Sequence, residues 1–268
     1  MKPLTYFVPI DFTQASYNAL QYAVLLAKES DGQVKLCHVL DLNEIPESDN
    51  PVVVSLALDK LLQEAGRKLK SLREFISLDS INVGEDIIMG SIRYSLINRI
   101  EKVKPDVIVM GRRTESKINR WSVIHYITKN TSTPVLVIPQ NHNPKIPDRA
   151  AVTIDVHPEL VVKFKALLSI IKKISPEISI LNIRGSKENA NRQDWIEDLR
   201  SNYGIKAQFL SGENTTGAGG LDHFIKENKI DLLYNVKAKK SWLGRLLSSV
   251  HSAQQDNSAV PYLNYNAE

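Results

Sequence analysis

The chain has 268 residues, 43% of them hydrophobic, which is enough for two ordinary domains with packed cores. Its 34 basic and 30 acidic residues leave a net charge of only +4, which argues against a nucleic-acid-binding protein. The single cysteine, Cys37, excludes an intrachain disulfide and is typical of a reducing compartment. Neither a signal peptide nor a membrane-spanning stretch is predicted, so we expect a cytoplasmic protein without a membrane partner.

The first half of the chain alternates apolar runs with amphipathic segments. Residues 5–10 form a predicted strand that ends at Asp11, Thr13 can cap the following helix, and Gly32 is its predicted stop. Further strands are predicted at residues 34–40, 81–83, 106–110 and 135–138, with helices at 54–75, at 91–103 and from Ser122 onward. Gly111 is expected to end the fourth strand. This alternation predicts an α/β fold with a doubly wound parallel sheet.

The same pattern starts again after a proline-bearing linker at residues 141–148. Predicted strands lie at residues 150–154, 178–183, 206–210, 231–236 and 261–265, with helices at 160–173, 193–203 and 221–227. Pro261 follows Ser249 at the same spacing at which Pro134 follows Ser122. We therefore predict two tandem five-stranded domains, residues 1–140 and 149–268, joined by the linker. Because its end is polar, the last strand is expected to be short or to lie at a sheet edge.

Two parts of the first half resemble the universal stress protein family. Gly111, Ser122-Val123 and the run Pro134-Val135-Leu136-Val137 are similar to the family's glycine loop, helix start and closing strand. The opening, with Asp11, Thr13 and Ser16, and the strand end at His38-Val39 are similar too. The resemblance covers residues 1–140 strongly and the rest weakly. It implies strand order 3-2-1-4-5 in each copy. We also predict a pseudo-dimer in which the copies meet across their last strands, because a closed two-fold contact buries an apolar sheet edge.

The resemblance also implies a nucleotide site with ATP as its ligand. In nucleotide-binding members, the strand-end Asp and the residue after the second strand hold base and ribose, while the glycine loop and the Ser-led helix wrap the phosphates. Carried over residue by residue, the first-copy candidates are Asp11, Val39, Gly111, Arg113, Thr114, Ser122 and Val123. The second-copy candidates are Asp155, Ser248, Ser249 and Val250.

The loop that would hold phosphate departs from the family pattern. Thr114 and Trp121 stand where the family has glycines, and the loop between them is shorter. Arg112 and Arg113 could supply charge-assisted donors in place of the glycines, whereas we expect Trp121 to cover the phosphate position. The matching residues also have structural explanations: Gly111 would permit a turn, and Asp11 and Ser122 would cap helices. We therefore expect a degenerate site.

Other catalytic patterns are missing from the sequence. The glycine-rich residues 212–220 lack the Walker lysine, and residues 84–85 align with them as an ordinary β–α loop. The six histidines show no metal-ligand spacing, and there is no G-x-S-x-G elbow. We expect a non-enzymatic stress-response or regulatory binding protein without metal, acting with an unidentified protein partner and with homodimerisation left open. The alternatives are an ATP-binding universal stress protein and a nucleotide-hydrolysing α/β enzyme, which would need a second acid near Gly111.

Overall fold

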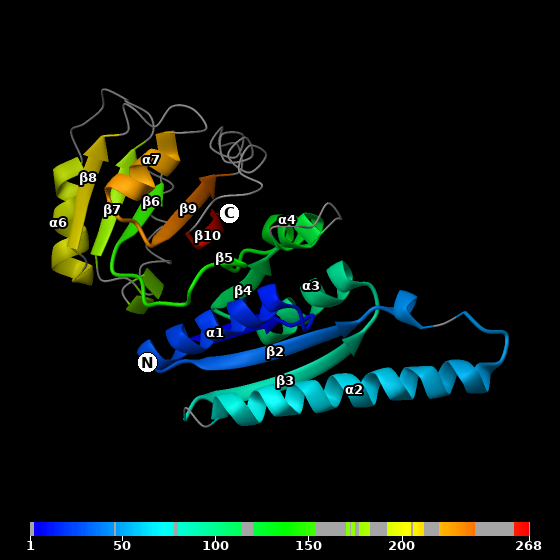
Figure 1. Ribbon diagram of the computed structural model, residues 1–268. Coiled ribbons are helices and arrows are strands. Elements are labelled where there is room, and N and C mark those ends of the chain that lie inside the picture. The colour runs from blue at the N-terminus through cyan, green and yellow to red at the C-terminus, as the bar shows by residue number, and fades with distance from the viewer. Residues whose placement is uncertain are drawn as a thin grey trace.

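The computed structural model describes residues 3–45, 47–77, 80–113, 120–153, 170–171, 173–174, 177–182, 192–204, 206–211, 220–238 and 260–267. Figure 1 shows two α/β units that follow one another along the chain and meet side by side at β5 and β10. Among the described residues, no helix is both long and apolar enough to cross a membrane.

The first unit is a parallel five-stranded sheet with helices on both faces. Its strands are β1 (Thr5–Pro9), β2 (Gln33–Leu40), β3 (Asn82–Met89), β4 (Val107–Arg112) and β5 (Val135–Pro139). The helices are α1 (Gln14–Glu29), the short 3₁₀ helix η1 (Leu42–Glu44), α2 (Pro51–Ser77), α3 (Ile92–Val103) and α4 (Arg120–Asn130). The strand order is β3-β2-β1-β4-β5, which confirms the predicted 3-2-1-4-5 topology.

The second unit repeats this order. It contains β6 (Ala150–Thr153), β7 (Glu177–Asn182), β8 (Lys206–Ser211), β9 (Leu232–Ala238) and β10 (Tyr262–Ala267), with α6 (Arg192–Tyr203) and α7 (Gly220–Glu227). Its strands lie in the order β8-β7-β6-β9-β10, and each pairs with its neighbours in parallel. The tandem α/β architecture predicted from the repeated pattern is therefore confirmed.

The two sheets join through their last strands. β5 and β10 pair antiparallel, with Leu136 opposite Leu263, so that ten strands form one continuous sheet. This confirms the expected contact between copies, but the expectation that the last strand is short or at an edge is wrong. β10 has six residues and lies between β5 and β9. Its polar residues are accommodated because the ladder satisfies the backbone, and Asn264 is buried there.

The segment between the sheets is held by both copies. The Asn18 side-chain amide donates hydrogen bonds to the carbonyl oxygens of Pro139, Gln140 and His142, at 3.0, 3.2 and 2.7 Å. Farther along, Asp231 of the second copy accepts hydrogen bonds from two backbone N–H groups at the end of this segment. These contacts tie the start of the segment to α1 and its end to the residue before β9.

Side chains of alternating strand positions form a core on each face of the sheet. Tyr6 and Val8 of β1 pack toward α1 and the buried residues of α2, whereas Phe7 and Ile108 pack toward α3 and α4. Strands buried on both faces read as continuous apolar runs, which is why β1, β4 and β5 were predictable from sequence. The carboxyl ends of β1 and β4 therefore lie side by side between two layers of helices.

Two expectations about strand ends are wrong. Gly111 does not end the fourth strand, because β4 continues through Gly111, paired with Ile138, to Arg112. The third strand is not residues 81–83 but all of β3, and residues 84–85 lie within it rather than in a loop. β3 is an edge strand with charged side chains, so its pattern lacks the apolar run of a central strand.

Helix ends differ from the expectations in three places. α1 ends at Glu29 with Ser30 as its C-cap, and Asp31, with φ of 49°, takes the left-handed position expected of Gly32. α2 begins at Pro51 rather than at residue 54, because the Asn50 side chain caps it and proline suits the first helical position. α4 begins at Arg120, so Ser122 lies inside the first turn instead of capping it.

Candidate functional site

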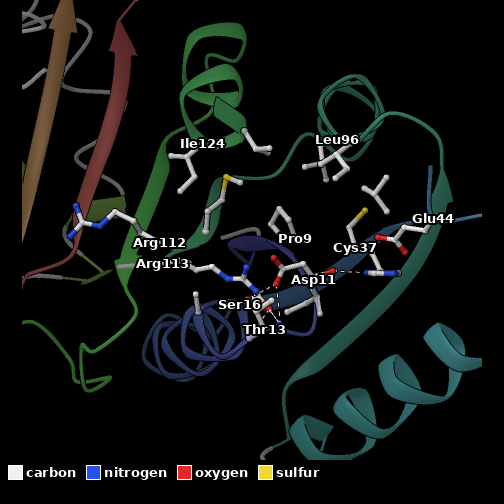
Figure 2. A pocket seen from close by; sticks show the side chains of 18 residues that line it. Pro9, Asp11, Thr13, Ser16, Cys37, Glu44, Leu96, Arg112, Arg113 and Ile124 are labelled. Carbon is white, nitrogen blue, oxygen red and sulfur yellow. Dashed lines mark hydrogen bonds between the residues drawn. The ribbon is translucent and has the colours of Figure 1, made fainter. Parts of the chain in front are cut away.

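A cavity of about 180 Å³ opens at the carboxyl ends of β1 and β4 (Figure 2). The chain leaves β1 toward β2 on one side and reaches β4 on the other, so this is the switch point where ligands bind in open α/β sheets. One wall is apolar and is formed mainly by Cys37, Leu96, Met110, Val123 and Ile124. The polar lining residues, which we call the polar rim, include Asp11, Thr13, Ser16, His38, Glu44 and Arg113.

Asp11 lines the cavity and binds Thr13, the N-cap residue of α1. Its Oδ1 accepts hydrogen bonds from the Thr13 backbone N–H at 3.1 Å and from the Thr13 hydroxyl at 2.6 Å. Thr13 caps α1, as predicted from the sequence, and it forms a capping box with Ser16 that was not predicted. Thr13, not Asp11, is therefore the N-cap of α1, and Asp11 holds that capping residue while its carboxylate lies at the cavity rim (Figure 2).

The turn between β1 and α1 has an uncommon backbone. Phe12 has φ of 57°, in the left-handed region that non-glycine residues seldom adopt. Its ring lies 4.5 Å from the His38 ring, centroid to centroid, and the Lys68 ammonium lies 5.1 Å from the Phe12 centroid. His38 Nδ1 donates to the Ile10 carbonyl oxygen at 2.7 Å. These contacts from β2 and α2 hold the turn, and sequence reasoning assigned His38 no role in the site.

Gly111 brings α1 against β4. A Cβ at this position would lie 2.0 Å from the Ala15 carbonyl oxygen and 2.9 Å from the Ser16 nitrogen. No side chain fits there, because the obstructing atoms belong to backbone. The glycine is therefore required for close helix–strand packing, and the explanation that it permits a turn is wrong.

The two arginines after Gly111 point in different directions. Arg112 is 7% exposed, and its guanidinium lies 5.9 Å from the ring centroid of Tyr262 on β10. Arg113 instead extends along the cavity toward Asp11 (Figure 2). Successive residues leaving a strand alternate in direction, which explains the split. Both arginines line the cavity, but the Arg113 side chain extends into it, while the Arg112 guanidinium points toward Tyr262 of the second copy.

The cavity holds one thiol, on its apolar wall. Burial raises the pKa of Cys37 to about 12, so the group stays protonated at neutral pH and is a poor nucleophile. Within the described part of the chain, no group of three or more His, Cys, Asp or Glu side chains is placed to hold a metal ion.

Five of the seven candidate residues line this cavity: Asp11, Val39, Gly111, Arg113 and Val123. Ser122 lies in the first turn of α4, and its side chain, like that of Trp121, is outside the described structure. Thr114 and the second-copy candidates Asp155, Ser248, Ser249 and Val250 are outside the described residues. Sequence reasoning missed the apolar wall, because Leu96 and Met110 come from elements whose apolar residues look like ordinary core.

Comparisons with known proteins agree with this geometry. A model of the universal stress protein family matches residues 7–139, which contain the whole cavity. A universal stress protein of Methanocaldococcus jannaschii is 28% identical over 137 residues, which are 49% of this chain and 79% of that protein.

Solved structures extend the likeness beyond the first copy. A universal stress protein from Archaeoglobus fulgidus covers 100% of both chains with a TM-score of 0.78 at 18% identity, which shows the shared tandem fold. A family protein from Arabidopsis thaliana with AMP bound covers 52% of this chain and 93% of its own length, at 17% identity and a TM-score of 0.36. The chain belongs to the universal stress protein family, and residues 7–139 carry that membership.

Proposed function

We propose that this universal stress protein is a non-enzymatic regulatory binding protein with a degenerate nucleotide site in its first copy. In this proposal the cavity takes the base and ribose of an adenine nucleotide and holds the phosphates only weakly. The apolar wall of Leu96, Met110 and Ile124 suits a flat heterocycle that loses water on binding. Asp11, on the polar rim, offers carboxylate oxygens to ribose hydroxyls.

The main support for weak phosphate binding is the balance of charged side chains that line the cavity. Among its described lining residues, the carboxylates of Asp11 and Glu44 face one inward-directed cation, Arg113, since Arg112 is turned toward Tyr262. Two carboxylates near one guanidinium do not favour a triphosphate, which brings several negative charges. Gly111, one of the glycines that would free backbone donors for phosphate, is needed instead for the contact with Ala15.

Calorimetry with adenosine, AMP and ATP tests this proposal directly. We expect adenosine to bind at least as tightly as ATP, with AMP between them or equal, because the phosphates gain little. ATP binding more than tenfold tighter than adenosine would contradict the degenerate site. The absence of heat with all three ligands at millimolar concentration would contradict a nucleotide site of any kind. Mass spectrometry of small molecules released from the purified protein provides an independent check.

A second candidate is an ATP-binding universal stress protein in which an arginine replaces the missing glycines. The reach of Arg113 into the cavity favours it, because a guanidinium donates two parallel hydrogen bonds to a phosphate. The same titrations distinguish the two candidate functions, because only the ATP-binding candidate requires the affinity to rise from adenosine through AMP to ATP.

A further inference from the structure

A second carboxylate lines the cavity besides that of Asp11. It belongs to Glu44, the last residue of η1, whose side chain is exposed. Asp11 is engaged with Thr13 through two hydrogen bonds, whereas no side-chain hydrogen bond or ion pair of Glu44 occurs within the described residues. The acceptor positions of the Glu44 carboxylate are therefore open to a ligand.

Hydrogen bonds fix the turn that contains Glu44. Directly after β2, the Asp41 carboxylate accepts hydrogen bonds from the backbone N–H and the side-chain amide of Asn43, at 3.0 and 2.8 Å. The Glu44 N–H donates to the Asp41 carbonyl oxygen at 2.9 Å. The next N–H group, of Ile45, donates to the Leu42 carbonyl oxygen at 3.3 Å. Because the backbone is held, a ligand that binds Glu44 orders only one side chain.

Glu44, Asp11 and Arg113 lie across the cavity in the order of the strands that precede them. Glu44 follows β2, Asp11 follows β1 and Arg113 follows β4, and these strands are neighbours in the order β2-β1-β4. Figure 2 shows Asp11 between the side chains of the other two residues. Since neighbouring strands are about 4.8 Å apart, the ends of β2 and β4 are separated by roughly 10 Å, which is comparable to the length of a nucleoside. The cavity thus has an acidic end at Glu44 and a basic end at Arg113.

This charge distribution orients a nucleoside that binds as proposed above. With the ribose at Asp11, the 5′ carbon that bears any phosphate points toward Arg113, because opposite charges attract. The base then lies at the other end of the cavity, beside Cys37 of β2, which Figure 2 shows close to Glu44. The edge of the base that is farthest from the ribose therefore faces the Glu44 carboxylate.

We propose that Glu44 determines base specificity by accepting a hydrogen bond from the 6-amino group of adenine. This inference rests on the proposed function and names the ligand class as 6-aminopurine nucleosides and their phosphates. An ionised carboxylate only accepts hydrogen bonds, so it favours a base that presents an N–H group. A purine with hydrogen in place of the 6-amino group has no such donor, and a purine with oxygen at position 6 presents an acceptor there.

Calorimetry with adenosine and purine riboside tests this role, because the two nucleosides differ only in the 6-amino group. We expect wild-type protein to bind adenosine about three- to tenfold more tightly, a small factor for a hydrogen bond to a charged group because Glu44 is exposed. Glu44→Ala should weaken adenosine binding by the same factor and leave purine riboside binding unchanged. Because the side chain is exposed, circular dichroism should show a folded variant.

A neighbouring glutamate provides the matched control. Glu47 is exposed on the same segment but is not among the residues that line the cavity, so Glu47→Ala removes the same charge without removing the proposed contact. This variant should bind both nucleosides as wild type does. An equal loss of adenosine affinity in Glu44→Ala and Glu47→Ala would show a general effect of charge and overturn the proposal.

The same titrations separate the failure of this inference from the failure of the proposed function. Equal affinities of wild-type protein for adenosine and purine riboside, or an unchanged preference in Glu44→Ala, would overturn the role of Glu44 and leave the nucleotide site in place. Guanosine bound more tightly than adenosine would also overturn it, because the carboxylate would then accept from the donors at positions 1 and 2 of guanine. The absence of binding of every nucleoside at millimolar concentration would contradict the nucleotide site itself.

Discussion

Gly111 on β4 and Ala15 on α1 are so close that a methyl group on the glycine would stand 2.0 Å from the alanine carbonyl oxygen. This contact seats the first turn of α1, with Thr13 and Ser16, against the cavity. A residue that matches a phosphate-binding signature thus has a packing role that is independent of any ligand.

Gly111→Ala should destabilise the protein by about 1–3 kcal/mol or more, because backbone atoms cannot move aside as a flexible side chain would. Gly66→Ala is the matched control. Gly66 lies within α2, and a Cβ there would meet only the Ile87 side chain at an ordinary 3.9 Å. Helix propensity should make that variant more stable by ~0.5–1 kcal/mol. Urea unfolding measures both, and a Gly111→Ala variant as stable as wild type would contradict the close contact.

Substitutions of the two arginines should affect different properties, which are ATP binding for Arg113 and stability for Arg112. Arg113→Ala should weaken any ATP binding by ~1–3 kcal/mol, the usual contribution of hydrogen bonds to charged groups, and should leave adenosine binding unchanged. Arg112→Ala should instead lower stability, because it removes a buried guanidinium from Tyr262. Calorimetry and urea unfolding on both variants check this. Loss of ATP affinity in Arg112→Ala but not in Arg113→Ala would reverse the assignment.

Replacing Trp121 tests whether its side chain blocks the phosphate position. Trp121→Gly should cost about 1 kcal/mol of stability from helix propensity alone, since α4 begins at Arg120. The variant should also bind sulfate or phosphate at the helix terminus more tightly than wild type does. Trp195→Gly, near the start of α6 in the second copy, controls for the loss of a tryptophan from a helix. The anion affinity of each protein is measured from the rise of its thermal unfolding midpoint with sulfate or phosphate concentration. Equal anion affinity in wild type and Trp121→Gly would exclude the blocking role.

The pair of Tyr262 and Arg112 predicts a pH dependence at the junction between copies. Burial raises the pKa of Tyr262 from an ordinary value of 10 to about 12, and the nearby guanidinium opposes this shift. The unfolded chain loses the phenol proton first, so the contribution to stability is complete below pH 10 and is lost as the pH rises toward 12. Tyr262→Phe removes this dependence. Wild-type stability should fall more steeply than that of the variant, by about 1.3 kcal/mol between pH 9 and pH 11, as measured by urea unfolding at pH 9, 10 and 11.

Local sequence patterns predicted the structure correctly wherever residues close together in sequence determine it. Apolar runs located the central strands, Thr13 located the start of α1, and equal spacings in the two halves revealed the tandem repeat. The candidate site residues came from the family resemblance, and five of them line one cavity because a parallel sheet gathers its strand ends and helix starts at one edge. The strand order itself came from the family resemblance, since periodicity does not say which strands pair.

Tertiary structure decided what depends on partners distant in sequence. β3 has eight residues because an edge strand pairs along its length with β2, although its charged side chains interrupt any apolar run. β10 is a central strand despite its polar end, because it forms hydrogen bonds with β9 on one side and with β5 of the other copy on the other side. The separate directions of Arg112 and Arg113, and the approach of Ala15 to Gly111, follow from how helices and a second sheet pack on β4. The residue types in the sequence determine what can be buried or capped, whereas the packed chain determines which partner each residue meets.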